Sequence, residues 1–173
     1  MQNKSGLLKK CIPLCFVLVM VAVDQLTKLM IVWWLPKDQT HITVIPGLID
    51  FVFTENPGAA FGLFADHRWV FMTLTAVTLV VLLGLYWFRG FHTRLAVAAV
   101  MMIIAGGIGN MIDRIVRGVV IDFINFSFIT FPVFNIADCL VVIGCGMLIV
   151  HLILDSIRES NNKREDASKG ERS

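Results

Sequence analysis

The sequence predicts an all-α integral membrane protein, a bundle of four transmembrane helices with a small extracytoplasmic platform and loop rich in β-structure. Two observations lead to this fold class: 57% of the 173 residues are hydrophobic, and only 16% are charged. A soluble domain carries about 25% charged residues, so this chain lacks the polar surface to cover a globule in water. The same composition excludes a disordered chain and a disulfide-rich secreted module. A net charge of +2 is too small for a nucleic-acid-binding protein.

Four apolar segments are long enough to cross a bilayer, which takes about 20 residues at 1.5 Å each. They cover residues 12–34, 69–88, 95–112 and 134–154. The first is longer than the apolar core of a cleavable signal peptide and no A-x-A site follows it, so we expect it to remain as a transmembrane helix. Together the segments define one membrane domain over residues 1–155. The charged extension at 156–173 is expected to be disordered.

Basic residues lie mainly on one side of these segments. Ten Lys and Arg residues belong to the N-terminus, to the link between the second and third segments, and to the C-terminal extension, whereas five lie near the opposite ends. An excess of positive charge marks the cytoplasmic side of a membrane protein. We therefore expect both termini to be cytoplasmic and residues 35–68 and 113–133 to face outward.

Both outward segments contain stretches typical of β-strands. Residues 42–53 are β-branched and aromatic, and Pro46-Gly47 marks a turn, which predicts a short hairpin. Residues 119–134 have a similar composition, so we expect the two segments to form one platform. The small residues between Asn56 and Gly62 permit close approach of backbone or of an extended ligand. The alternative for that stretch is a plain connecting loop.

Ionisable side chains at membrane depth cost about 2.5–3.5 kcal/mol or more each, so each of them needs an explanation. Asp24 and Lys28 are four residues apart on one helical face and can pair, either as a structural salt bridge or as part of a site. Two further pairs with this spacing lie at the end of the third segment: Asn110 with Arg114, and Asp113 with Arg117.

Asp122 and Asp138 are the strongest candidates for catalysis. Asp122 follows the third segment, Asp138 lies about one turn inside the fourth, and the intervening run with Pro132 allows the chain to turn back. Two carboxyl groups in a poorly solvated place cannot both ionise easily. One is then expected to hold a proton while the other activates water, as in aspartic proteases. The alternative is a polar cluster with Asp24 and Arg114 that only holds the helices together.

Other catalytic chemistries lack the residues they need. The four histidines are scattered and fit no H-E-x-x-H motif, there is no G-x-S-x-G, and no glycine-rich phosphate loop follows a strand. The four cysteines lie in apolar segments without a C-x-x-C motif, so we interpret them as small apolar residues. We therefore expect neither a metal ion nor a cofactor.

Five motifs follow one another along the chain: Asp24-Gln25-x-x-Lys28, Asn56-x-Gly58-Ala59-Ala60-Phe61, Gly106-x-x-Gly109-Asn110-x-x-Asp113-Arg114, Val120-Ile121-Asp122-Phe123 and Phe134-Asn135-x-Ala137-Asp138. In this order they resemble the motifs of bacterial lipoprotein signal peptidase, also called signal peptidase II. The resemblance covers nearly the whole chain up to about residue 155. Each motif is weak by itself, but five in order across four predicted spans are highly specific.

The resemblance implies an aspartic endopeptidase of the bacterial cytoplasmic (inner) membrane with its active site near the outer face. Such an enzyme would remove the signal peptide from a diacylglyceryl-modified prolipoprotein by cutting before the lipidated cysteine. Inhibition by globomycin-type peptides is implied as well. We expect a monomer whose partners include membrane lipids. By position, the resemblance implies catalysis by Asp122 and Asp138, substrate binding by Asn56, Gly58, Asn110, Arg114 and Asn135, and support by Asp24 and Lys28.

Two other functions stay open on the residues alone. A small transporter or channel subunit could use the same carboxyl groups as a proton or cation path. Transporters of that kind show inverted repeats or broken helices, and the sequence shows neither. A non-catalytic membrane scaffold would use the polar residues only to join its helices.

Overall fold

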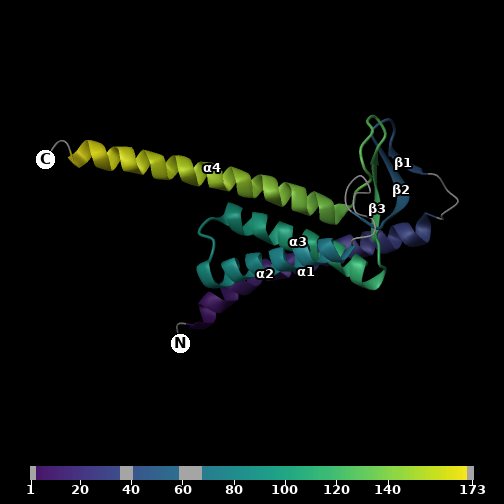
Figure 1. Ribbon diagram of the computed structural model, residues 1–173, viewed down its shortest axis with the longest axis horizontal. Coiled ribbons are helices and arrows are strands. Elements are labelled where there is room, and N and C mark those ends of the chain that lie inside the picture. The colour runs from purple at the N-terminus through teal and green to yellow at the C-terminus, as the bar shows by residue number, and fades with distance from the viewer. Residues whose placement is uncertain (1–2, 36–40, 59–67, 171–173) are drawn as a thin grey trace.

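The computed structural model describes residues 3–35, 41–58 and 68–170. Expectations for residues 1–2, 36–40, 59–67 and 171–173, among them the Ala59-Ala60-Phe61 part of the second motif, lie outside these ranges. Figure 1 shows long helices running side by side, with the strands gathered at the end away from both termini. The order of elements is α1 (Asn3–Trp34), β1 (Ile42–Ile45), β2 (Ile49–Asn56), α2 (Arg68–Gly84), the π-helix η2 (Leu85–Arg89), α3 (Arg94–Val116), β3 (Val120–Phe126) and α4 (Ile136–Gly170).

Four stretches of helix in the described chain are long and apolar enough to cross a membrane. They are Lys10–Trp34, Trp69–Phe88, Arg94–Val116 and Ile136–Lys163, with hydropathies between 2.0 and 2.4. Their outward side chains are apolar: Val80 is 71% exposed and Val142 is 70% exposed. Such an apolar surface is stable in contact with lipid but not in contact with water. The predicted bundle of four membrane helices is therefore confirmed.

Two helices continue past the apolar segments that the sequence marks. α3 runs to Val116 instead of ending at 112, because the carboxylate of Asp113 is paired with Lys28 and Arg117. α4 continues as a helix to Gly170, in contrast to the disordered extension expected from residue 156. A helix already nucleated by its apolar part can propagate into polar sequence. The exposed pair of Glu159 and Lys163, 2.7 Å apart at i,i+4 spacing, favours this continuation.

The strands form one antiparallel sheet in the order β1-β2-β3. β1 and β2 are the predicted hairpin, and Gly47 in its turn has a φ of +70°, a conformation that favours glycine. β3 comes from the second β-rich stretch and pairs with β2, with Thr54 opposite Asp122 and Asn56 opposite Val120. The expected single platform is confirmed, and this register places Asn56 beside Asp122.

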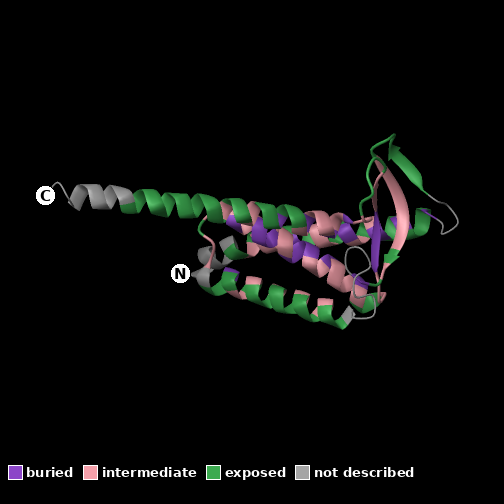
Figure 2. Cartoon of the chain, turned by 45° about the horizontal axis from the view of Figure 1, so that its top comes forward, coloured by how far each residue is buried: buried purple, intermediate pink, exposed green. Residues whose placement is uncertain are grey.

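α3 is the central helix of the bundle, since it packs against α1, α2 and α4. In Figure 2 buried residues line α3, while α2 and the far part of α4 are mostly exposed. A second, smaller apolar cluster of Ile31, Leu35 and Phe123 joins the end of α1 to β3. The larger core cluster contains Val17, Tyr86, Val100, Met101, Ile104, Ala105 and Leu140.

Glycines allow α3 and α4 to pack closely. A Cβ atom on Gly106 would lie 2.3 Å from the carbonyl oxygen of Ala137, and one on Gly144 would lie 2.8 Å from the carbonyl oxygen of Ala99. Small residues at such contacts permit backbones of membrane helices to approach each other. The contact at Ala137 fixes the first turn of α4, which carries Asp138.

Gly106→Ala is expected to destabilise the protein, because the added methyl group collides with backbone that cannot move without separating α3 from α4. We expect the free energy of unfolding to fall by about 1–3 kcal/mol, measured by thermal unfolding in detergent. Gly146→Ala is the matched control, since a Cβ there has nothing within 4 Å. It should be neutral or stabilising by about 0.5–1 kcal/mol. Equal melting temperatures for the two variants would contradict this account of the packing.

Candidate active site

Asp122 and Asp138 meet through one asparagine. The side-chain nitrogen of Asn135 donates to Asp122 Oδ1 at 2.6 Å, and its backbone N–H donates to Asp138 Oδ2 at 3.1 Å. Both carboxyl groups line the same cavity of about 490 Å³. The chain returns as the sequence suggested: Phe134 bridges to Ile124 on β3, so α4 begins next to the strand that carries Asp122.

Asn135 also begins α4. Its side-chain oxygen accepts from the N–H of Asp138 at 3.0 Å, while the Asp138 carboxylate accepts from the N–H of Asn135. This reciprocal pair of bonds is a capping box, which satisfies N–H groups at the start of a helix that otherwise lack partners. Asp138 therefore lies in the positive first turn of α4, where a negative charge is stabilised.

Each carboxyl group accepts a further amide hydrogen bond. Asn56 Nδ2 on β2 donates to Asp122 Oδ2 at 2.9 Å, and Asn110 Nδ2 on α3 donates to Asp138 Oδ1 at 2.7 Å. Asn56, Asn110 and Asn135 were expected from the sequence to bind substrate. The structure shows that they hydrogen-bond the two carboxyl groups, and their expected role in substrate binding stays a prediction.

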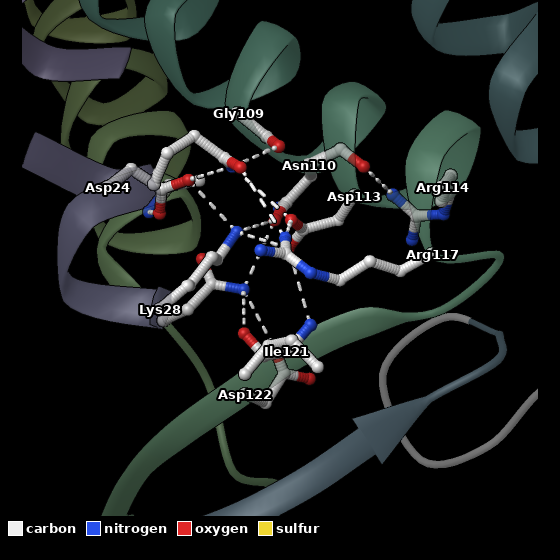
Figure 3. Close-up of polar contacts among 12 residues, drawn as sticks. Asp24, Lys28, Gly109, Asn110, Asp113, Arg114, Arg117, Ile121 and Asp122 are labelled. Atoms are coloured by element: carbon white, nitrogen blue, oxygen red, sulfur yellow. Dashed lines mark hydrogen bonds and ion pairs between the residues drawn. The ribbon is translucent and has the colours of Figure 1, made fainter. Parts of the chain in front are cut away.

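Lys28 is completely buried and is the centre of an ion cluster. Its Nζ lies 2.9 Å from Asp24 Oδ2, 2.9 Å from Asp113 Oδ2 and 3.0 Å from Asn110 Oδ1. These partners match the three donors that an ammonium group carries. Figure 3 shows Lys28 on α1 among these side chains, with Asn110 and Asp113 projecting from α3. Because Lys28 and Asn135 Nδ2 both donate to Asn110 Oδ1, the Asn110 Nδ2 group must face Asp138.

The carboxylates of the ion cluster reach the backbone on either side of the site. Asp24 Oδ1 accepts from the N–H of Ala137 at 3.0 Å, and Asp113 Oδ2 accepts from the N–H of Ile121 at 3.3 Å. These neighbours precede Asp138 and Asp122 in the chain. Buried charges of this kind need both counter-charges and hydrogen bonds, and here the bonds connect α1, α3, β3 and α4.

Sequence reasoning found the Asp24–Lys28 and Asp113–Arg117 pairs separately but missed that they form one cluster. Arg117 pairs with Asp113, and Gln25 Nε2 donates to Asp24 Oδ2 at 3.1 Å and to Asp113 Oδ1 at 3.3 Å. The sequence feature that could have predicted the cluster is the number of ionisable groups at membrane depth, because each of these groups needs a partner.

Arg114 reaches the same cavity from α3. Its Nη2 donates to the carbonyl of Gly58 at 3.1 Å, and the N–H of Gly58 donates to Asn56 Oδ1 at 3.0 Å. Among the described residues, Arg114 Nε is buried and has no hydrogen-bond acceptor. The Arg114 side chain also lines the cavity.

The cavity is polar at one end and apolar over the rest. Phe131, Val142 and Ile143 on its apolar side are among the exposed large hydrophobic residues of the described chain. Cys139, which follows Asp138, lines the cavity as well. Within the described ranges, no group of three or more His, Cys, Asp and Glu side chains is placed to hold a metal ion.

The environment of Asp122 changes its proton affinity. Burial raises the pKa of Asp122 to about 6, and the charge of Asp138 acts in the same direction. The amides of Asn56 and Asn135 and the charge of Lys28 oppose this rise. A carboxyl group with such a pKa can hold a proton near neutral pH, which an ordinary aspartic acid cannot.

The described chain thus combines four helices that are long and apolar enough to cross a membrane with two carboxyl groups in one cavity. The model of one protein family, described as signal peptidase (SPase) II, matches residues 16–154. The chain therefore belongs to the signal peptidase II family, and it is a membrane protease. The resemblance that the five motifs indicated is confirmed.

Similar proteins and structures agree with this assignment. A lipoprotein signal peptidase of Brevibacillus brevis is 36% identical over 137 residues, which is 79% of this chain and 91% of that protein. One of Streptococcus pneumoniae is 34% identical over 152 residues, 86% of this chain and 97% of that protein. A solved bacterial membrane enzyme is 29% identical with a TM-score of 0.78, over 83% of this chain and 88% of that one.

Lys28→Met is expected to lower the free energy of unfolding by about 3–5 kcal/mol, because it leaves buried carboxylates without their ammonium partner. Adding Asp24→Asn should restore part of this loss, since the double variant no longer buries the unpaired charge of Asp24. Lys163→Met is the control: Lys163 is 74% exposed, and exposed ion pairs contribute about 0–1 kcal/mol. Thermal unfolding in detergent measures all of these variants. Strictly additive effects of Lys28→Met and Asp24→Asn would contradict the cluster.

Proposed function

We propose that the chain is an aspartic endopeptidase that removes signal peptides from diacylglyceryl-modified prolipoproteins by cutting before the lipidated cysteine. The observation that carries the proposal is the contact of Asn135 with both Asp122 and Asp138 at the polar end of the cavity. Family membership supports the substrate class, since the relatives are named lipoprotein signal peptidases.

The surroundings of the two carboxyl groups favour different protonation states. Asp138 lies in the first turn of α4 and accepts a backbone N–H and the Asn110 amide, whose direction Lys28 sets. These contacts favour its ionised form. Asp122 lies on the buried strand β3 and has a pKa of about 6. We therefore assign the base to Asp138 and the proton to Asp122.

The reaction follows from this assignment. Asp138 takes a proton from a water molecule as the water oxygen attacks the scissile carbonyl carbon, and Asp122 gives its proton to the carbonyl oxygen. When the tetrahedral intermediate collapses, the C–N bond breaks and the leaving amine takes the proton held by Asp138, while the hydroxyl proton returns to Asp122. One water molecule is consumed for each peptide bond, and both carboxyl groups recover their starting states.

Substrate contacts are assigned from the remaining groups of the cavity. The guanidinium group of Arg114, which lines the cavity, would bind a carbonyl oxygen of the substrate. Gly58, held by Arg114 and Asn56, would place its backbone beside the extended chain. The apolar side near Val142 and Ile143 suits the signal peptide and the acyl chains, which would enter from the lipid.

The proposed orientation puts both termini in the cytoplasm and the carboxyl pair near the outer face of the inner membrane. The sheet lies at the opposite end of the bundle from the termini, and most basic residues belong to the terminal side. Action as a monomer is part of the proposal. Globomycin-type peptides are expected to inhibit by occupying this cavity. Transporter and scaffold functions are not favoured, because the family consists of peptidases.

Asp122→Asn and Asp138→Asn should each reduce kcat for cleavage by about 10²–10⁴-fold or more, because each removes a proton-transfer group. The assay incubates purified protein with a diacylglyceryl-modified precursor and, in parallel, with the unmodified precursor. Asp50→Asn on β2 is the control, since Asp50 contacts Ser127 outside the cavity. A folded Asp122→Asn or Asp138→Asn variant that cleaves at the wild-type rate would refute the proposed pair.

Activity should fall as the pH rises through about 6, because Asp122 must be protonated. Asn56→Ala removes a donor that stabilises ionised Asp122, so the pKa of Asp122 rises and this limb of the kcat/KM profile moves to higher pH. Ser127→Ala should leave the limb in place, since that hydroxyl contacts Asp50 at 2.6 Å and lowers the pKa of Asp50 instead. A limb that stays fixed or moves to lower pH in Asn56→Ala would show that Asp122 is not the acid.

A further inference from the structure

A groove of about 650 Å³ lies at the end of the bundle away from the sheet. Pro13 and Phe16 of α1 form one wall, and the start of α3 with the link before it forms the other. Along α3 the lining changes from Arg94 at the rim to Val97 and then Met101. At 1.5 Å per residue this apolar part extends about 10 Å inward from the charged rim.

Positive charge gathers at the rim of the groove. Arg94 and His92 are exposed and line it; His92 precedes α3, and Arg94 is the first residue of that helix. Lys10 lies one turn before Pro13 on α1, where its Nζ donates to the carbonyl of Trp87 at 2.8 Å and lies 5.6 Å from the centre of the Trp87 ring. None of the described residues that line the groove is acidic.

We infer that this groove binds one anionic phospholipid, with the phosphate against Arg94 and an acyl chain between α1 and α3. The groove matches the polarity of such a molecule, because Arg94 lies at one end and apolar side chains line the other. Its rim coincides with the ends of two membrane spans, at Lys10 and Arg94, which is the depth of lipid headgroups. Basic pockets between membrane helices are a known form of anionic-lipid site.

Other occupants fit the groove less well. A free phosphate ion would use the rim but leave the apolar wall empty, and a zwitterionic lipid would bring a cationic group of its own to the basic rim. A helix of another protein would need a longer apolar face than about 10 Å. The inference is independent of the carboxyl pair, because the groove and the cavity lie at different ends of the bundle.

The test compares phosphatidylglycerol with phosphatidylcholine carrying the same acyl chains. Each lipid is titrated into the full-length protein in detergent, and native mass spectrometry measures how much stays bound. We expect one phosphatidylglycerol molecule to be retained in clear preference to phosphatidylcholine. Arg94→Gln should weaken its binding about fivefold, the effect of one interfacial cation. Arg158→Gln, which removes an exposed charge from α4 outside the groove, is the matched control and should change nothing.

A second variant tests the apolar part of the groove. Ala98 lines the wall and is half-buried, so Ala98→Phe fills the space meant for the acyl chain and should reduce retention of phosphatidylglycerol. Inorganic phosphate should fail to displace the lipid. Equal losses in Arg94→Gln and Arg158→Gln, no preference for phosphatidylglycerol, or full retention by Ala98→Phe would each overturn the inference. Melting temperatures confirm that the compared variants are folded.

Discussion

The buried ammonium group of Lys28 is the constraint on which the site depends. A charge inside a membrane protein cannot stay without partners, and the partners of Lys28 come from α1 and α3. The same carboxylates accept the N–H groups of Ala137 and Ile121, each adjacent to one of the two acidic residues of the cavity. The carboxylates that pair with Lys28 therefore also fix the start of α4 relative to the start of β3.

In the proposed mechanism, that placement gives two identical side chains different roles. Asp138 is surrounded by donors whose direction is set, a backbone N–H and the amide of Asn110. Asp122 lies on a buried strand, and burial is the largest cause of its raised pKa. Different environments can thus divide the roles of acid and base between two aspartic acids, which is the general route to such chemistry near neutral pH.

The bilayer explains the remaining architecture. A substrate with an apolar leader and acyl chains stays in the lipid, so a site that accepts it has to open through the side of the bundle. In the proposed function, the exposed apolar residues around the cavity form that opening. At the other end, Lys10 and Arg94 lie where two membrane-length helices begin, and the groove beside them has a similar division into polar and apolar parts.

Local patterns were sufficient to predict the four spans, the hairpin with its Pro46-Gly47 turn, and the pairing of Asp24 with Lys28. Hydropathy, turn preference and i,i+4 spacing are properties of neighbouring residues, so they can be read without knowing the fold. The joining of two ion pairs into one cluster, the contact of Asn135 with both carboxyl groups, and the contact of Arg114 with Gly58 could not be read in this way. They depend on which faces of distant helices meet, and glycines at the contact between α3 and α4 allow the close approach that decides this.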